Sequence, residues 1–510
     1  MTPGKPDLRW PAKAAASAVF CLAGALAGTG LYFADLAYAG PQTPYAIADR
    51  TGTCFDSGPT VVLRAAGECV GVTDGSYSFA PSLEQVDGLI EAEDRRVRSS
   101  GDRYVSVAYV LPVAAADDAE SDKGAAEQLE GAFAAQYYAN QHNLGSGTPL
   151  IQLLVASSGA GAAGYLTTDK VIEGDAAAQR LVAVAGIETS STATLAEVRE
   201  LTANGIPVIG STITSDAFDN VPDLVRVAPS EAHQVNAALA YIKPAARTAM
   251  VVADDNQADL YDSTLASDFL RSFPDKTHSI IGIDTYNTAG DADGSGEVTV
   301  EIVQLAADIC ASRPNVVLFA GRGPELATLI SALDVRRCPF PVTILTGDDG
   351  TSMPITPDVG SALRGPVTLD YAGEASPDEW DQPEAGSVYK GILPAVIQQG
   401  RLGFGRFQAA FASHFPVASA DDGYAMMGYD AALTGITGIR LAGDGATAAA
   451  VAQEFGSIKG IRSVPGASGP IAFSAVYLGP DGQGSNPVDK VVPILQLPSS
   501  GNPRLLALEP

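Results

Sequence analysis

The chain has 510 residues, 46% of them hydrophobic and 18% charged, so it folds around packed cores and is not a disordered protein. Lysine and arginine total 31 against 59 aspartates and glutamates, which gives a formal net charge of −28. So negative a surface repels phosphate backbones, and nucleic acid is not expected as a partner. The four histidines are scattered and no HExxH or CxxC spacing occurs, so we expect neither a metal nor a cofactor.

The N-terminal segment predicts export. A basic stretch ending at Lys13 precedes residues 14–34, which carry no charge and are long enough to cross about 30 Å of hydrocarbon as a helix. The basic flank stays inside, so the remainder lies outside the cell membrane. Ala37-Tyr38-Ala39 also fits a signal-peptidase site. Residues 1–39 are therefore a cytoplasmic tail with a transmembrane anchor, or a signal peptide whose cleavage after Ala39 secretes the protein.

Beyond that segment the chain contains four cysteines, namely Cys54, Cys69, Cys310 and Cys338. An even number in an exported chain favours two disulfides. Pairing by proximity joins Cys54 to Cys69 and Cys310 to Cys338, each bond closing a short loop and contributing roughly 3 kcal/mol. Four free buried thiols are the alternative.

Residues 40–100 differ in amino-acid pattern from the rest of the exported chain. Gly, Pro and Thr surround two short β-rich runs at 60–63 and 69–73, and a polar helical stretch occupies 83–97. This pattern predicts a small stalk closed by a disulfide.

From Arg103 onward apolar β-type runs alternate with amphipathic helices, which predicts parallel sheets covered by helices on both faces. The part of the chain with this pattern is too long for a single sheet, so we expect an α/β protein with two lobes. Ligands of such sheets lie at the carboxyl ends of the strands. The expected strands are 104–111, 150–155, 181–186, 207–209, 248–252, 279–283, 315–319 and 342–345.

One motif favours a dinucleotide-dependent enzyme. Residues 159–164 read GAGAAG, a GxGxxG that comes after a strand, and Glu188 stands near where a dinucleotide fold places its ribose-binding acid. However, three residues separate strand and glycines, and Thr167-Thr168-Asp169 is expected to interrupt the helix. A flexible Gly/Ala loop is the other interpretation.

A second motif, residues 291–297, matches the opening of a calcium loop. Position twelve of that loop must be a glutamate, and Ile302 stands there. A solvated acidic turn before a helix at 300–309 explains the segment instead. No GxSxG or SxxK lies in a strand-turn-helix context, so nucleophilic catalysis is not indicated.

Residues 182–216 carry the strongest site signal. An apolar strand ends at Gly186, and a Ser/Thr-rich junction at 189–192 leads into a helix. Such a junction presents free N–H groups and a positive dipole end to a carboxylate. A second hydroxyl-rich loop lies one strand later, at 211–215. The two loops form a polar crevice suited to a small zwitterion, unless they are ordinary caps and turns.

These motifs recur in a known order. The segment 182–216 is succeeded by RVAPS at 226–230, NVVLFAGRGPE at 315–325, GDDG at 347–350 and YAMMGYDAAL at 424–433. From about residue 103 to the C-terminus, this order resembles the leucine/isoleucine/valine-binding proteins. Those are type I periplasmic solute-binding proteins of amino-acid ABC transporters.

The resemblance implies two Rossmann-like lobes joined by three hinge crossovers. Lobe 1 would comprise 101–242 with 370–465, and lobe 2 would comprise 243–369 with 466–500. Asp349 would pair with the ligand's ammonium group, so Asp349→Ala should abolish a ligand-induced rise in melting temperature and leave the apo protein nearly unchanged. The implied ligand contacts are Ser190, Ser191, Thr192, Thr212 and Thr214 from lobe 1, and Tyr261, Arg322, Asp348 and Asp349 from lobe 2.

The resemblance also implies the function. A monomeric protein would capture a small polar solute, such as an amino acid, between its lobes and deliver it to an ABC permease without catalysis. Arg322 stands where the family commonly has an aromatic contact, which suggests a ligand with an extra acidic group or a different ligand altogether. A ligand-sensing module for signalling is the main alternative, and the dinucleotide-dependent enzyme is a more distant one.

Overall fold

The computed structural model describes residues 53–113, 119–142, 148–159, 162–291, 296–382, 387–416, 420–474 and 484–510. Cys54–Pro510 forms one compact unit, which contains both lobes. The predicted anchor or signal peptide at 1–39 lies outside the described residues. Within the described ranges, no helix combines the length and the apolar character that a membrane crossing requires.

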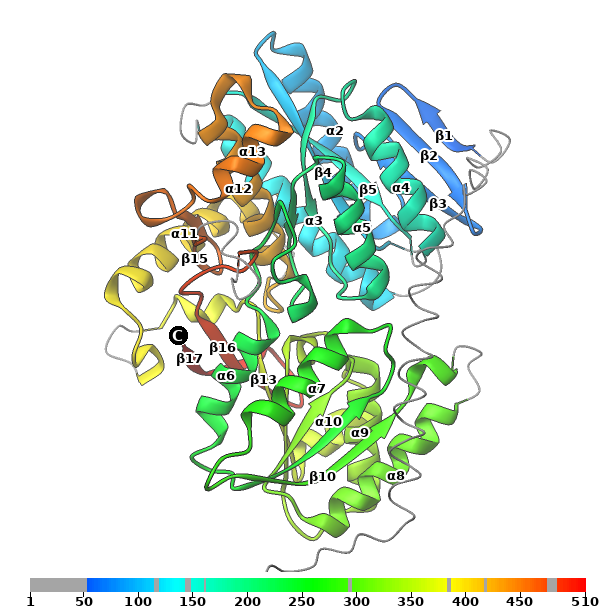
Figure 1. Ribbon diagram of the computed structural model, residues 1–510, viewed down its shortest axis with the longest axis vertical. Helices are drawn as coiled ribbons and strands as arrows, with labels where there is room; N and C mark the ends of the chain where they lie inside the picture. Colours follow the sequence, from blue (N-terminus) through cyan, green and yellow to red (C-terminus); the bar gives the residue numbers. More distant parts are fainter. Residues whose placement is uncertain are drawn as a thin grey trace, which may run out of the picture. The chain divides into compact units, whose positions relative to one another are not determined.

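The first lobe is built on an eight-stranded sheet of order β1-β2-β3-β5-β4-β6-β7-β8 (Figure 1). The five strands from β4 to β8 are parallel, whereas β3 runs antiparallel to β5. Strands β4 and β5 are buried along most of their length because helices cover both faces of the sheet. The strands are β1 Thr53–Ser57, β2 Thr60–Ala65, β3 Glu68–Thr73, β4 Tyr104–Leu111, β5 Leu150–Ser157, β6 Leu181–Gly186, β7 Val208–Gly210 and β8 Leu224–Arg226.

The second lobe is built on a seven-stranded sheet of order β10-β9-β11-β12-β13-β16-β17. Its first five strands are parallel, and β16 and β17 add an antiparallel edge. This is the parallel α/β arrangement that the alternating pattern predicts. The strands are β9 Thr248–Asp254, β10 Ser279–Tyr286, β11 Val316–Ala320, β12 Val342–Thr346, β13 Val367–Ala372, β16 Val492–Leu497 and β17 Arg504–Glu509.

Side-chain caps fix the start of several helices. Ser191, Ser230 and Asp259 each accept a hydrogen bond from a backbone N–H in the first turn of the helix that begins after them. Lobe 1 carries α2 Glu84–Ser99, α3 Ala119–Gln141, α4 Ala162–Asp175, α5 Thr192–Ala203, α11 Pro394–Ala412, α12 Tyr424–Ala442 and α13 Ala448–Phe455. Lobe 2 carries α6 Glu231–Ile242, α7 Leu260–Ser272, α8 Glu297–Ser312, α9 Gly323–Arg336 and α10 Pro357–Arg364.

The expected stalk at 40–100 is not a separate element where the structure describes it. Strand β3 pairs with β5, with Val72 opposite Ala156, so the β1–β3 segment extends the sheet of lobe 1. Helix α2 buries Val86 and Ile90, and Leu83 just before it, in the same hydrophobic core as α3. The apolar faces of this segment are covered by the lobe, which is why the segment does not stand alone.

The expected lobe boundaries also shift. Helix α6 packs against α7 and β16, so lobe 2 begins after β8 rather than at residue 243. The hairpin of β14 (Val464–Gly466) and β15 (Gly469–Ile471) packs against α11, so lobe 1 continues past 465. The chain therefore changes lobe three times, after β8, after β13 and before β16, and three crossovers are what the resemblance implied.

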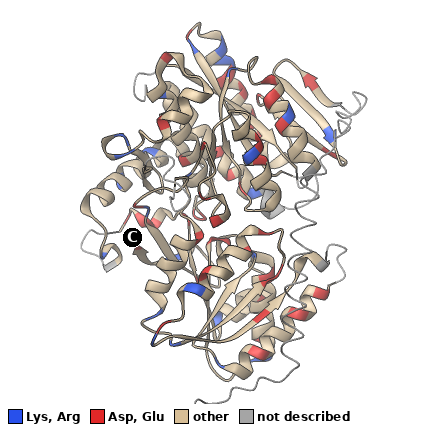
Figure 2. Ribbon diagram, viewed as in Figure 1, with Lys and Arg blue, Asp and Glu red and all other residues tan. Residues whose placement is uncertain are grey.

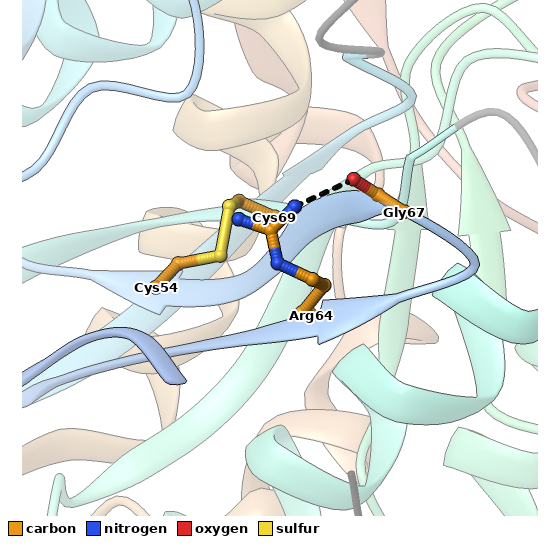
Figure 3. The surroundings of a disulfide bond; sticks show 4 residues. All are labelled: Cys54, Arg64, Gly67 and Cys69. Atoms are coloured by element: carbon orange, nitrogen blue, oxygen red, sulfur yellow. Dashed lines mark hydrogen bonds between the residues drawn. A yellow bond between two sulfur atoms is a disulfide. The ribbon is translucent and has the colours of Figure 1, made fainter. Parts of the chain in front are cut away.

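Both predicted disulfides are confirmed. Cys54 is bonded to Cys69 between β1 and β3, and Cys310 is bonded to Cys338 between α8 and the segment after α9. Figure 3 shows the first bond, beside which Arg64 donates a hydrogen bond to the carbonyl of Gly67. The two bonds lie one in each lobe, at Cα separations of 5.9 Å and 5.1 Å.

Candidate functional site

A cavity of about 490 Å³ lies between the lobes and is lined by both of them. This volume falls in the range of small-molecule sites. Lobe 1 contributes α3, the ends of β6 and β7, and the start of α12, whereas lobe 2 contributes the loops after β11 and β12. The lining residues are Gly124, Glu188, Thr189, Thr212, Arg322, Pro324, Asp348, Asp349, Thr351, Ser352, Pro354, Gly373, Glu374, Ala375, Asp422 and Tyr424.

Carboxylates dominate the wall of the cavity. Glu188 comes after β6, Asp348 and Asp349 after β12, and Glu374 after β13, so each group stands at the carboxyl end of a strand. Asp422 completes the set just before α12. Acidic positions also outnumber basic ones on the ribbon as a whole (Figure 2).

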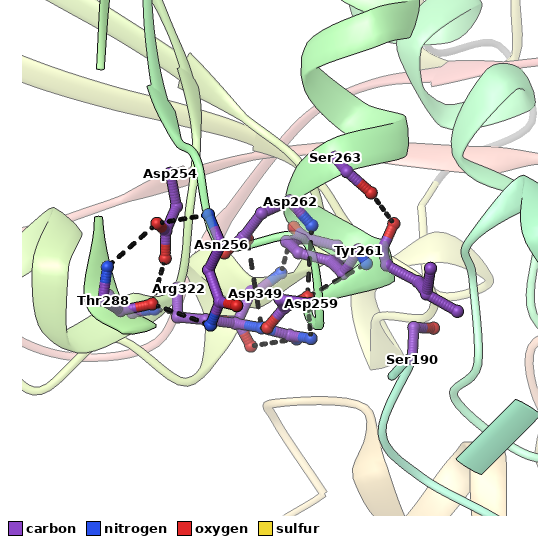
Figure 4. A network of polar contacts seen from close by, with 12 residues as sticks. Ser190, Asp254, Asn256, Asp259, Tyr261, Asp262, Ser263, Thr288, Arg322 and Asp349 are labelled. Carbon is purple, nitrogen blue, oxygen red and sulfur yellow. Dashed lines mark hydrogen bonds and ion pairs between the residues drawn. The ribbon is translucent and has the colours of Figure 1, made fainter. Parts of the chain in front are cut away.

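Arg322 is the one cation among the described residues that line the cavity, and its charge is already matched. Its Nε and Nη2 atoms each lie 2.9 Å from a carboxylate oxygen of Asp259 (Figure 4). The guanidinium stacks over the ring of Tyr261, 4.4 Å from the ring centre. A bidentate pair with a stacked ring holds Arg322 in place and leaves Nη1 as its free edge. That edge lies 3.8 Å from Asp349.

Asp349 supports the fold of its own lobe. One oxygen accepts a hydrogen bond of 2.6 Å from the N–H of Gly323, the first residue of α9, and the other accepts one of 3.0 Å from Ser352. The N–H of Asp349 donates to the hydroxyl of Tyr261 at 3.1 Å. The carboxylate thus satisfies a backbone donor at a helix start, where negative charge is stabilised.

Three other carboxyls keep an oxygen that is buried and accepts no hydrogen bond: Glu188, Asp348 and Glu374. Burial raises the pKa of Glu188 to about 7, and the neighbouring charge of Asp349 adds to that rise. Burial and Asp349 likewise raise the pKa of Asp348 to about 7. The pKa of Glu374 lies well above its usual range, first because it is buried and then because Asp348 is near.

Asp422 has its own partner. Lys123 lies 2.7 Å from Asp422 and 3.2 Å from Glu127, so α3 and the start of α12 are tied by a small ion-pair network. The backbone carbonyl of Asp422 also accepts a hydrogen bond of 3.2 Å from Thr351 of lobe 2. The cavity is therefore bridged at this point by a contact between the lobes.

A second contact between the lobes is made by the main chain; we call it the seam and define it as residues 190–192 with 258–261. The carbonyl of Ser190 accepts from the N–H of Leu260 at 3.0 Å, and the N–H of Thr192 donates to Ala258 at 3.0 Å. The side chain of Ser190 points back into lobe 1, where its hydroxyl accepts from the N–H of Thr214 at 3.0 Å.

Four of the nine expected ligand contacts, Thr212, Arg322, Asp348 and Asp349, line the cavity, and their role in binding stays a prediction. The other five do not line it, because their polar groups are used by the fold. Ser191 caps α5 and the hydroxyl of Thr214 donates to Glu231, while Tyr261 is 1% exposed beneath Arg322. Ser190 and Thr192 belong to the seam.

Sequence reasoning missed several lining residues, chiefly Glu188, Glu374 and Tyr424 as binding groups. A signal for two of them exists: at the ends of three apolar strands a glycine and a carboxyl come within three residues, in AGIE at 185–188, TGDD at 346–349 and AGE at 372–374. Only the second of these was assigned to the site. No comparable sequence pattern predicts that Tyr424 lines the cavity. Tyr424 is placed there by the packing of α12 on α3.

Gly164, the last glycine of the GxGxxG segment, serves packing. Helix α4 runs unbroken from Ala162 to Asp175, so the expected interruption at Thr167-Thr168-Asp169 does not occur. The hydroxyl of Thr168 donates to the carbonyl of Ser157, and Asp169 is buried, so both side chains pack within the lobe. A Cβ on Gly164 would lie 2.0 Å from the carbonyl of Ser158, so this glycine lets the helix approach β5. Most of the acidic turn at 291–297 lies outside the described residues. Among those described, no group of His, Cys, Asp or Glu could hold a metal ion.

The sequence pattern of the periplasmic binding protein family matches residues 167–492. The chain belongs to this family of solute-binding proteins. The match covers strands β6 to β13 and every strand end that lines the cavity, and it confirms the resemblance drawn from the motifs. No curated protein sequence matches this periplasmic binding protein.

Solved structures support the two-lobed fold. A substrate-binding protein from Desulfitobacterium hafniense in complex with Leu superposes with a TM-score of 0.57 at 16% identity, over 79% of this chain and 100% of that one. The leucine-binding protein LivK from Thermotoga maritima gives 0.55 at 17%, over 79% and 98%. A solute-binding protein from R. palustris in complex with benzoate gives 0.54 at 15%, over 79% and 96%.

Proposed function

We propose that this periplasmic binding protein captures a small polar solute in the interlobe cavity and delivers it to an ABC permease. The solute is held on the outer side of the cell membrane, with the protein either anchored by residues 14–34 or released by cleavage after Ala39. The similar proteins from D. hafniense, T. maritima and R. palustris are substrate-binding proteins, with Leu or benzoate in two of the structures. Family membership and the fold favour binding without catalysis.

The observation that carries this proposal is the cavity itself. Its wall is contributed by two lobes that the chain connects through three crossovers, so a bound solute contacts both halves at once. A ligand that contacts both lobes favours the closed conformation, because it makes fewer contacts when the lobes are apart. Hinged binding proteins close around their ligands in this way. Buried polar groups in the wall give the contacts that select a solute.

A thermal-shift screen tests the function. Neutral, anionic and cationic solutes are added to the purified exported portion, and at least one is expected to raise the melting temperature by several degrees, since a ligand at 100 times its Kd stabilises by about 2.7 kcal/mol. Gly124→Leu places a side chain in the cavity from α3 and should abolish the shift. Gly405→Leu, on the exposed face of α11, is the matched control and should preserve it. A screen in which no solute of any charge shifts either protein would contradict solute capture.

A further inference from the structure

We propose that the cavity selects an organic cation that carries at least two positively charged nitrogens. This inference rests on the proposed solute-binding function and adds the chemical class of the solute. Diamines and dibasic amino acids share that chemistry. From the sequence alone, Arg322 suggested either a ligand with an extra acidic group or a different ligand altogether.

The balance of charge around the cavity gives the first argument. Lys123 pairs with Asp422, and the bidentate contact with Asp259 neutralises Arg322. Asp349 lies 3.8 Å from Arg322, so the lining carboxyls without a cationic partner are Glu188, Asp348 and Glu374, and Arg322 is the only basic residue in the described wall. Burial raises the pKa of Glu188, Asp348 and Glu374, so a cation beside these carboxyls is stabilised by their ionisation, whereas an anion opposes that ionisation.

Glu374 gives the second, independent argument. It is 9% exposed and lines the cavity, yet its Oε1 accepts no hydrogen bond. The nearest buried cation, Lys490, donates to Ser468 and lies among Asp430 and Glu379 as well, so it is shared among several acids. A buried carboxyl oxygen without a donor is costly, and a donor from the solute removes that cost.

The positions of the carboxyls indicate the shape of the cation. Glu188 and Glu374 belong to the side of lobe 1 or its crossover, and Asp348 and Asp349 belong to lobe 2. No three acidic side chains among the described residues are close enough to hold a metal ion. Carboxyls contributed from both sides of the cavity match an elongated solute with more than one charged nitrogen.

Three hydroxyls in the cavity wall donate within the protein: Thr212 to the carbonyl of Glu188, Thr351 to the carbonyl of Asp422 and Ser352 to Asp349. Ser190 accepts from backbone N–H groups of its own lobe, and Thr214 donates to the buried carboxyl of Glu231. Arg322 offers only its Nη1 edge, beside Asp349. A carboxylate on the solute is therefore not required, and diamines are expected to bind alongside dibasic amino acids.

Isothermal titration calorimetry on the purified exported portion tests this class. The probes are putrescine and agmatine, which lack a carboxylate, lysine and arginine, which carry one, and leucine and glutamate as the neutral and anionic comparisons. We expect at least one dication to bind at least tenfold more tightly than leucine, with glutamate weakest. Tighter binding of putrescine or agmatine would identify the solute as a diamine. Tighter binding of lysine or arginine would identify it as a dibasic amino acid.

Two variants connect the affinity to the cavity. Glu374→Gln removes the charge but keeps the size of the side chain, and should weaken binding of the dication at least tenfold while the apo protein stays folded. Glu84→Gln makes the same change on an exposed position of α2 and should leave the affinity unchanged.

Leucine or glutamate binding more tightly than putrescine, agmatine, lysine and arginine would overturn the inference and leave solute capture intact. If Glu374→Gln and Glu84→Gln lost the same amount of affinity, Glu374 would not contact the solute, and the inference would be overturned as well. Failure of every solute, including those outside this panel, would instead contradict the proposed function on which it rests.

Discussion

At the scale of single residues, the site places similar carboxyls in different roles. Asp349 accepts hydrogen bonds from the first N–H of α9 and from Ser352, whereas Glu374 keeps an oxygen without a donor. The first group is therefore part of the architecture of lobe 2, and the second is available to a solute. This division changes what Asp349→Ala is expected to do, because the sequence alone predicted an unaltered apo protein.

Asp349→Ala should lower the free energy of unfolding of the apo protein by about 1–3 kcal/mol, the cost of leaving a buried hydrogen-bonding group without its partner. The substitution leaves the N–H of Gly323 without its acceptor and removes one neighbour of Arg322. Urea unfolding followed by circular dichroism measures the change. Asp349→Asn, which keeps an acceptor oxygen, should lose less, and an alanine variant as stable as the parent would show that Asp349 does not support α9.

At the scale of elements, lobe 1 depends on the close approach of α3 and α12. A Cβ on Gly131 would lie 1.9 Å from the carbonyl of Ala425, and one on Gly428 would lie 2.0 Å from the carbonyl of Gln128. Each helix thus presents a glycine to the backbone of the other. The contact matters for the site because Gly124 of α3 and Tyr424 of α12 both line the cavity.

Gly428→Ala should destabilise the protein by at least about 1–3 kcal/mol, the usual cost of an added methyl group in a packed interior, because the obstacle is backbone that cannot rotate away. Differential scanning calorimetry should show a lower melting temperature. Gly405→Ala is the control: this glycine lies in α11 with nothing within 4 Å of the added Cβ, and alanine favours helix there. Equal melting temperatures for the two variants would argue against tight packing of α3 on α12.

At the scale of the whole molecule, the acidic cavity couples stability to pH. The folded state raises the pKa of Glu188 from 4.5 to about 7 and that of Asp348 from 3.8 to about 7, mainly through burial. Between those values the folded protein binds more protons than the unfolded chain. The contribution of these groups is therefore fully present near pH 4 and is lost as the pH rises through about 7.

The melting temperature of the apo protein should accordingly fall between about pH 5 and pH 8, as calorimetry across that range would record. Glu188 faces Asp349 and Gln128, and Asp348 faces Asp349, Gln234 and Arg322. Glu188→Gln should flatten part of the slope, whereas Glu84→Gln should not. A melting temperature that rises steadily over this interval in the parent protein would contradict the assignment.

Much of the fold could be predicted from the sequence because hydrophobic periodicity and cysteine spacing are local. The alternation after Arg103 indicated the parallel sheets, and the close pairs of cysteines indicated both disulfides. Pairing partners are not local, which is why β1–β3 was interpreted as a stalk although β3 pairs with β5.

The site was harder to predict because polar loops at strand ends serve two purposes. Thr212 lines the cavity, whereas Ser190 and Ser191, on a loop of similar composition, form the seam and the cap of α5. No sequence pattern separates a hydroxyl that meets a solute from one that meets a backbone N–H. The glycine-carboxyl pattern at strand ends carried more information, since it repeats at three strands.

The seam at 190–192 and 258–261 is joined by backbone atoms, which every residue type possesses. Exchanging side chains of the cavity wall therefore leaves the seam itself unchanged, although the contact from Thr351 to the carbonyl of Asp422 depends on a wall side chain. Proteins built on this design could change the solute they bind through a few wall positions while keeping the main-chain contacts that join the two lobes.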